Sequence, residues 1–168
     1  MNSIMRVYLV RHGIAIDRDE PDCPPEAERY LTREGIARAK QAMTGLHALG
    51  DDLDTILTSP YVRAAQTARI AADAWKFDPK EIRTTDALLP EAAPKQLVEV
   101  LAKLDAKAVA CFGHAPNMDE VIAALVGAKS PFTEMKKAGA AHLELSEIKL
   151  GGAMLIGLYS SGVLRRVK

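Results

Sequence analysis

Four side chains that suit the binding of an anion lie just beyond short apolar segments of this chain. The segments cover residues 4–10, 54–58 and 108–112 and have the composition of buried strands. The four side chains are two guanidiniums and two imidazoles: Arg11, His12, Arg63 and His114. Open α/β sheets bind their ligands beyond the carboxyl ends of the strands. The sequence therefore predicts that these side chains converge in one crevice.

Such a crevice suits a compact dianion, because its charged groups are cationic and no acidic residue need lie near them. Arginine donates in a planar fork that matches phosphate oxygens. Positive neighbours disfavour protonation of an imidazole placed among them, so its ring keeps a lone pair near neutral pH. We expect one of the two imidazoles to attack phosphorus and form a phosphoimidazole, which water then hydrolyses. The other three groups would stabilise charge on the equatorial oxygens.

Two further donors are expected near the same strand ends. Ser59 directly follows the second apolar segment. The backbone N–H of Ala115 precedes a helix that Asn117 is predicted to cap. Because the positive end of that helix points to the same side, its first N–H groups can bind an anion. We therefore expect Ser59 and Ala115 to take part in phosphate binding.

The elements that must position these residues alternate between strand and helix. Further strands are predicted at residues 82–84, 142–145 and 154–159, the last two as a hairpin or a pair of edge strands with a turn at Gly151-Gly152. This alternation predicts a single three-layer α/β/α domain over residues 1–168. Its sheet should be mostly parallel, with one antiparallel edge.

Four helices are predicted from apolar residues that recur on one face, the first of them capped by Thr32. The inward positions are Ile36, Ala39, Met43 and Leu46; Ala64, Ala68, Ala71 and Trp75; Leu97, Leu101 and Leu104; and Val121, Ile122, Leu125 and Val126. The acidic, proline-rich residues 17–30 between the first strand and the first helix are predicted to form a loop.

The overall composition argues against several kinds of partner. Basic and acidic residues balance at 22 each, so no global field draws the chain to nucleic acid or to an acidic membrane. The apolar start is too short to span a bilayer. Cys23 and Cys111 stand far apart, which indicates neither a disulfide framework nor a thiolate metal site. A reduced, cytoplasmic setting is expected.

The motifs resemble those of the histidine phosphatase (phosphoglycerate mutase-like) superfamily. The matching residues run in order from about residue 6 to 125: Arg11-His12-Gly13, the Ser59-Pro60-x-x-Arg63 segment with Ala64, Gln66 and Thr67, and Gly113-His114. The short length, the Arg-His-Gly-x-Ala start, Leu88-x-Pro-Glu91 and Gly-His-x-Pro are similar to the small SixA-type phosphohistidine phosphatases. The resemblance implies that His12 is the phosphorylated nucleophile and that Arg11, Arg63 and His114 hold the phosphate, with no metal and no cofactor.

The chain departs from the larger members of that superfamily in one respect and leaves a second open. Larger members carry a phosphate-contacting asparagine shortly after the Arg-His-Gly motif, where this chain reads Ile14-Ala15-Ile16-Asp17. Many members use an acidic residue beyond the second arginine as general acid. Glu91 stands at a similar position, with Glu81 and Asp86 nearby. A phosphorus–nitrogen bond breaks readily once its nitrogen is protonated by solvent, so the acid is dispensable for that substrate.

By this resemblance the substrate is a phosphohistidine on a protein, which implies a role in signal transduction. The stretch between Arg63 and His114 leaves little room for a capping subdomain, so the pocket should admit a protein side chain. The same openness suits a broad-specificity monoesterase of small phosphorylated metabolites, which is the alternative. A catalytically idle phosphate-binding module is the third possibility. A mutase is disfavoured because it needs a closed site that excludes water.

Other enzyme classes do not fit the sequence. A cysteine phosphatase needs Cys-x5-Arg, but Asn117 stands at that spacing after Cys111. The glycine motifs of nucleotide-binding loops do not occur. A metal held by His12 and His114 would be repelled by the two arginines. Residues 17–30 are expected to be solvated or to form a rim that selects substrates, and Lys136 and Lys137 are expected to be plain surface residues.

Overall fold

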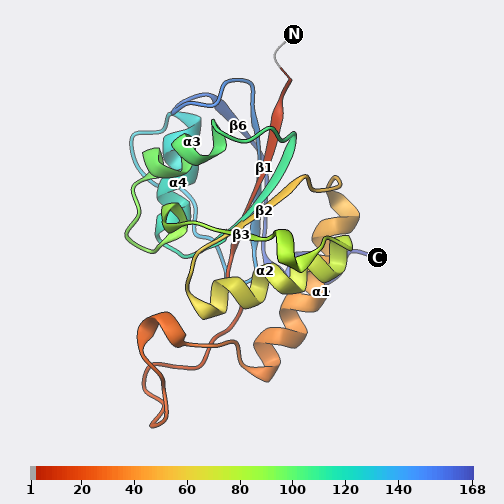
Figure 1. Cartoon of the computed structure of the whole chain (residues 1–168), viewed down its shortest axis with the longest axis vertical. Coiled ribbons are helices and arrows are strands. Elements are labelled where there is room, and N and C mark those ends of the chain that lie inside the picture. Colours follow the sequence, from red (N-terminus) through yellow and green to blue (C-terminus); the bar gives the residue numbers. More distant parts are fainter. Residues whose placement is uncertain (1–2) are drawn as a thin grey trace.

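The computed structural model, which describes residues 3–168, contains one six-stranded sheet with helices on both faces (Figure 1). The strands are β1 (Met5–Arg11), β2 (Thr55–Thr58), β3 (Arg83–Thr84), β4 (Ala108–Gly113), β5 (Ala140–Leu145) and β6 (Ala153–Tyr159). Each predicted strand is present with ends shifted by one or two residues. The helices are α1 (Arg33–Leu49), α2 (Val62–Trp75), α3 (Pro94–Leu101), α4 (Asn117–Val126) and α5 (Ser161–Leu164), and short 3₁₀ turns are η1 (Glu26–Glu28), η2 (Pro79–Glu81) and η3 (Asp86–Leu88).

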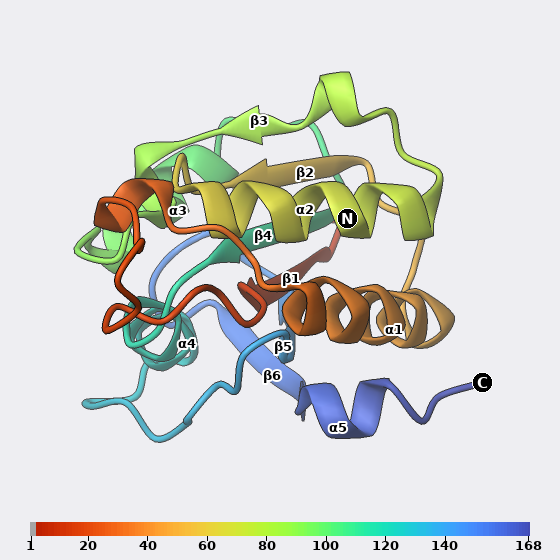
Figure 2. The same ribbon diagram turned by 90° about the horizontal axis from the view of Figure 1, so that it is seen from below.

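The order of strands across the sheet is β3-β2-β4-β1-β5-β6. The first four of these strands are parallel, and β5 is antiparallel to both of its neighbours. Because β2, β4 and β1 are adjacent and parallel, their carboxyl ends meet at one edge of the sheet. Figure 2 looks onto that edge. The predicted mostly parallel sheet with an antiparallel edge is confirmed.

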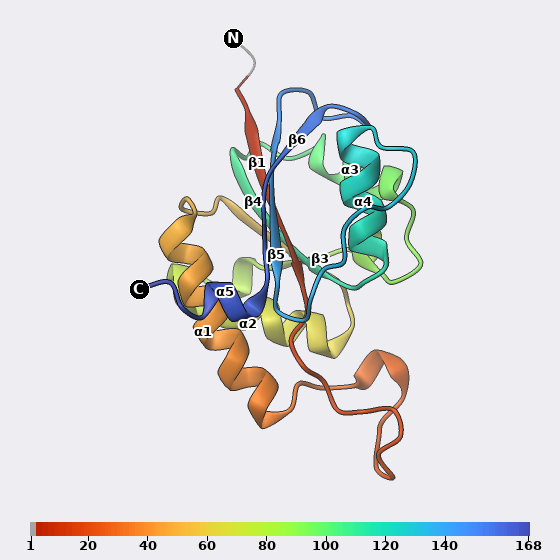
Figure 3. The ribbon, with the colours of Figure 1, turned by 180° about the vertical axis from the view of Figure 1, so that it is seen from behind.

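The two faces of the sheet carry separate apolar cores. Along β1, Val7 and Leu9 face the core that α3 and α4 cover, whereas Tyr8 and Val10 face the core that α1, α2 and α5 cover. This alternation is the period of two that an extended strand imposes. Figure 3 shows α3 and α4 on one side of the sheet and α1, α2 and α5 on the other. The structure therefore has the three predicted layers.

The first helix begins where the sequence predicts. The Thr32 hydroxyl accepts a hydrogen bond from the Gly35 N–H, which satisfies one of the free donors of the first turn. A Cβ at position 35 would collide with the carbonyl of Ile14, so only glycine lets this turn approach the chain just beyond β1. The start of α1 is thereby held close to the carboxyl end of β1.

Two predicted details of the helices are wrong. Asn117 does not cap α4: Pro116 holds the N-cap position, and the Asn117 amide donates to the carbonyl of Ala92 instead. The helix α3 ends at Leu101, and Leu104 follows outside it as a partly buried contact of the core. The first difference arises from a contact between segments, which local periodicity does not report. Among residues 3–168, no helix has the length and apolar character needed to cross a membrane.

Candidate active site

The imidazole of His12 is buried and has a defined orientation at the end of β1. Its Nδ1 lies 2.7 Å from the Gly13 carbonyl oxygen, which can only accept a hydrogen bond, so Nδ1 carries the proton. Its Nε2 lies 3.2 Å from Nε of Arg63, which can only donate. Burial, with a smaller contribution from the charges of His114 and Arg63, lowers the pKa of His12 to about 3 despite the opposing bond to Gly13. The ring is therefore neutral, with its lone pair on Nε2.

The second imidazole, His114, lies beside the first. The ring centroids of His12 and His114 are 5.3 Å apart, and Nε2 of His114 lies 2.9 Å from the Ser59 hydroxyl oxygen. Burial lowers the pKa of His114 to about 3, with a smaller contribution from the charge of Arg63. Its Nδ1 is buried without a hydrogen-bond partner. A buried polar atom without a partner is uncommon, and here it leaves one ring nitrogen available to a ligand.

The guanidinium of Arg63 is 3% exposed and is held from two sides. Besides its bond to His12, it donates to the backbone carbonyl of Glu26 at 2.6 Å and to the carboxylate of Glu26 at 2.8 Å. Arg63 lies in the first turn of α2, whereas Glu26 belongs to η1 in the loop after β1. The loop therefore closes over the guanidinium and compensates its buried charge.

Glu26 is the centre of a small ionic network. Its carboxylate accepts hydrogen bonds from Arg18, Arg29 and Arg63. Arg29 is itself buried and donates twice to the carbonyl of Ile16. Hydrogen bonding to Arg18, with the charges of Arg63 and Arg29, lowers the pKa of Glu26 to about 2 despite the opposing cost of burial. The loop over residues 17–30 is therefore not merely solvated.

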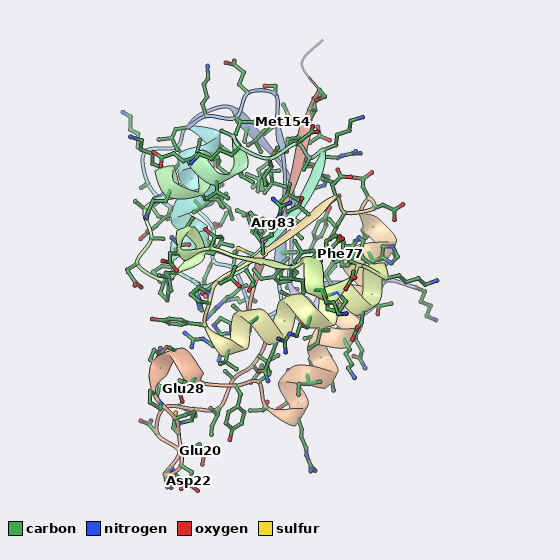
Figure 4. The ribbon with its side chains drawn as sticks, viewed as in Figure 1. Glu20, Asp22, Glu28, Phe77, Arg83 and Met154 are labelled. Atoms are coloured by element: carbon green, nitrogen blue, oxygen red, sulfur yellow. The ribbon has the colours of Figure 1, made fainter. Side chains whose placement is uncertain are left out.

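The remaining acidic residues of that loop face outward. Figure 4 shows Glu20, Asp22 and Glu28 on the part of the loop that extends away from the body of the molecule. The sequence did not single out Glu26 among six acidic residues. The local signal is a pair of prolines, Pro24 and Pro25, directly before it, which constrain the chain into the η1 turn. Its partner Arg63 is too distant in sequence for any periodic pattern.

Arg11 ends β1 and directly precedes His12 in the chain. One of its Nη atoms donates to the Met135 carbonyl at 2.7 Å, and its Nε is buried without a partner. Its charge helps to lower the pKa of both His12 and His114. Arg11 therefore contributes positive charge near both imidazoles, and its Nε has no protein partner.

Two residues of α2 fix the chain around these groups. The Thr67 hydroxyl accepts from the Gly13 N–H at 3.0 Å and donates to the Arg63 carbonyl at 2.8 Å. The Gln66 side chain accepts from the Leu31 N–H at 2.7 Å. Both were noticed in the sequence only as part of the resemblance. In the structure, they tie the end of β1 and the end of the loop to the helix that carries Arg63.

The three candidate general acids lie at different edges of the sheet. Glu81 ends η2, just before the parallel strand β3, and so lies at the opposite edge from His12. Asp86 and Glu91 follow β3 and lie toward the same edge as His12. Glu91 is exposed, in the turn that precedes α3. Next to it, the carbonyl of Ala92 accepts the Asn117 amide, which places this turn beside the start of α4.

The backbone of Ala115 lies between His114 and the start of α4, as predicted. Ser59 is fully buried, and its hydroxyl contacts His114 directly. The hydroxyl therefore orients that ring, and this contact occupies part of its hydrogen-bonding capacity. Within residues 3–168, no group of three or more His, Cys, Asp and Glu side chains is arranged to hold a metal ion. The arrangement is a cluster of cationic and neutral donors around one unprotonated imidazole nitrogen.

Replacing Glu26 by alanine tests whether this carboxylate holds Arg63. The change leaves a buried guanidinium without its carboxylate partner, which should lower the free energy of unfolding by about 1–2 kcal/mol after allowance for the partial exposure of Glu26. The measurement is urea denaturation at pH 7. The matched control is Glu28→Ala in the same turn, where the side chain is exposed and the loss should stay within about 0.5 kcal/mol. Equal losses would contradict the role of Glu26.

The two buried imidazoles predict a specific pH dependence of stability. In the folded protein their pKa values lie near 3, against 6.5 for a free imidazole, so the unfolded chain binds more protons between these values. The free energy of unfolding should therefore be highest above pH 6.5 and fall by about 1.4 kcal/mol per pH unit for each imidazole as the pH drops toward 3. His12→Asn and His114→Asn should each remove one such contribution, and the double variant both. A slope unchanged in the double variant would refute this.

Comparison with known proteins shows the family of this chain. The model of the histidine phosphatase superfamily (branch 1) matches residues 7–93. An uncharacterized protein of Picosynechococcus sp. is 37% identical over 144 residues, 80% of this chain and 82% of that protein. A phosphohistidine phosphatase SixA homolog of Haemophilus influenzae is 28% identical over 140 residues, 77% of this chain and 82% of that protein.

The same fold occurs in a solved structure, that of the protein histidine phosphatase SixA complexed with tungstate. The two structures superpose with a TM-score of 0.82 over 94% of this chain and 98% of that chain, at 22% sequence identity. This likeness confirms the predicted fold class. The family match over more than half of the sequence confirms the resemblance drawn from the motifs. This chain therefore belongs to the histidine phosphatase superfamily (branch 1).

Proposed function

We propose that this protein is a phosphatase that removes a phosphoryl group from phosphohistidine on a protein, through a covalent intermediate at His12. The observation that carries this proposal is the neutral, buried imidazole of His12, whose Nε2 lone pair faces the Arg63 guanidinium. A nucleophilic nitrogen beside fixed positive charge is the combination that phosphoryl transfer requires. The family match supports the reaction class.

In the first step, Nε2 of His12 attacks phosphorus and the bond from phosphorus to the leaving nitrogen breaks. The leaving nitrogen takes a proton from solvent or from an acidic side chain. The Arg63 Nε–H, which points at Nε2 in the free protein, turns to a phosphoryl oxygen as the lone pair is used. Nδ1 of His12 keeps its proton and donates it in a hydrogen bond to the Gly13 carbonyl oxygen, which stabilises the positive charge that the ring acquires.

The other donors hold the phosphoryl oxygens. Arg11 and Nδ1 of His114 bring polar atoms that are buried and lack protein partners, so a phosphoryl group would supply the missing hydrogen bonds. Ser59 orients His114 through its Nε2, and the backbone N–H of Ala115 adds a donor at the start of α4. In the second step, water attacks phosphorus, the phosphorus–nitrogen bond to His12 breaks, and inorganic phosphate leaves.

A protein substrate is supported by the relatives and by the chain between Arg63 and His114. One relative is named a phosphohistidine phosphatase SixA homolog. Between the two site residues, the chain forms the rest of α2, then β3, α3 and β4, all parts of the layers themselves. No inserted subdomain covers the edge of the sheet within this described stretch, so a side chain on a protein can reach it. The same access admits small phosphorylated metabolites, which remain the second candidate.

The intermediate can be trapped. In a rapid-quench experiment with radiolabelled phosphoramidate, we expect a phosphoryl-enzyme that is acid-labile and base-stable, as a phosphorus–nitrogen bond requires. His12→Ala should abolish it and lower kcat/KM by at least about a thousandfold. The matched control is His47→Ala, because His47, near the end of α1, packs against Trp75 of α2, away from this edge. Undiminished hydrolysis in His12→Ala would overturn the proposal, and tungstate binding without any turnover would favour an idle binding module.

The role of Glu91 is tested by comparing two leaving groups. Glu91→Gln should leave hydrolysis of phosphoramidate within about twofold, because solvent can protonate a leaving nitrogen, and should slow an alkyl phosphate ester by about a hundredfold. Glu81→Gln is the matched control, since Glu81 lies at the opposite edge of the sheet and should affect neither substrate. Equal losses on both substrates in Glu91→Gln would refute this role.

A further inference from the structure

A cavity opens beside Arg11, next to the site. It has a volume of about 450 Å³ and lies between α1, α5 and the segment that leads into β5. Figures 2 and 3 show α5 beside α1 near this edge of the sheet. The charged residues of its wall, which we call the basic groove, are Arg11, Arg38, Lys136, Lys137, Arg165 and Glu134.

The positive charge of the basic groove is only partly compensated. Lys136 pairs with Glu134, and Arg38 pairs with Glu34 on α1. Within residues 3–168, Lys137 and Arg165 have no carboxylate within 4.0 Å. At the inner end, the Nε of Arg11 is buried without a partner. In a chain whose charges balance overall, this is a local excess of positive charge, and Lys136 and Lys137 contribute to it as exposed surface residues.

The loop on the other side of the site has the opposite charge. Of its six acidic residues only Glu26 turns inward to Arg63, while Glu20, Asp22 and Glu28 project outward (Figure 4). A ligand that reaches His12 therefore meets negative charge toward this loop and positive charge toward the basic groove. Attraction on one side together with repulsion on the other selects both the partner and its orientation.

We propose that the basic groove binds an acidic segment of the protein that carries the phosphoryl group. This inference rests on the proposed function. A cavity of this size far exceeds what one phosphoryl group fills, and its cations come from four separate parts of the fold, so an extended ligand with several carboxylates fits it better than a single small anion. Exposed lysines and arginines at the rim attract such a partner from solution.

The groove and the nucleophile are linked through consecutive residues. Arg11 contributes to the wall of the groove, and His12 supplies the reacting nitrogen, so the distance between them is fixed by one peptide unit at the end of β1. An acidic segment in the groove would therefore hold its attached phosphohistidine in a fixed register with Nε2 of His12. The groove would lower KM for protein substrates without changing the chemical step.

The test uses two phosphohistidine peptides of equal length, one with four aspartates beside the phosphohistidine and one with four asparagines. For the wild-type protein we expect kcat/KM to be about tenfold higher on the aspartate peptide, and this preference should vanish in about 0.5 M salt. Lys137→Glu with Arg165→Glu should abolish or reverse the preference through KM and leave p-nitrophenyl phosphate turnover within about twofold. The matched control is Lys80→Glu with Lys129→Glu, because neither residue lines the groove.

A binding measurement separates failure of this inference from failure of the proposed function. Fluorescence anisotropy of the same aspartate sequence without phosphate should report binding that Lys137→Glu with Arg165→Glu weakens about tenfold and the control pair does not. If the protein turns over neither peptide, the proposed function fails. The binding measurement then still shows whether the basic groove binds an acidic segment. Equal kcat/KM on both wild-type peptides, or equal affinity in both charge-reversal variants, would overturn the inference.

Discussion

The carboxyl edge of this sheet depends on one contact, that of a buried guanidinium with a neutral imidazole. Arg63 would repel a protonated His12, and both groups are nearly inaccessible to water. The structure accommodates them by removing the proton from Nε2 and by supplying a carboxylate, Glu26, to the far side of the guanidinium. A buried charge is costly without a partner. The loop that carries Glu26 is therefore a structural part of the site.

The sequence predicted the members of the site better than their contacts. His12 and His114 follow buried strands, and strand ends are visible in composition alone. That they meet depends on the sheet order, in which β4 lies directly between β1 and β2. Parallel pairing of strands distant in sequence leaves no local trace, so the convergence had to be supposed from the fold class and from the family resemblance.

The details that sequence reasoning missed are contacts between segments. The inward turn of Glu26 could not be distinguished from five similar acids, because its partner lies on a helix that begins well beyond the loop. The Asn117 side chain has the chemistry of a helix cap, yet it satisfies the Ala92 carbonyl across a turn. In both places a local preference yields to a buried hydrogen bond that only the tertiary structure offers.

The site without a ligand keeps unpartnered hydrogen-bond donors in place, and this lowers the stability of the fold. The buried Nε of Arg11 and Nδ1 of His114 lack protein partners, and both imidazoles are kept neutral well below their ordinary pKa. A buried donor without a partner is unfavourable for folding, and the neutral imidazoles become unfavourable below pH 6.5. The unpartnered donors become favourable once an anion with several acceptor oxygens lies between them, since they then need no rearrangement. The cost to stability is thus localised at the one edge where the parallel strands end, and the two packed cores on either face of the sheet support that edge.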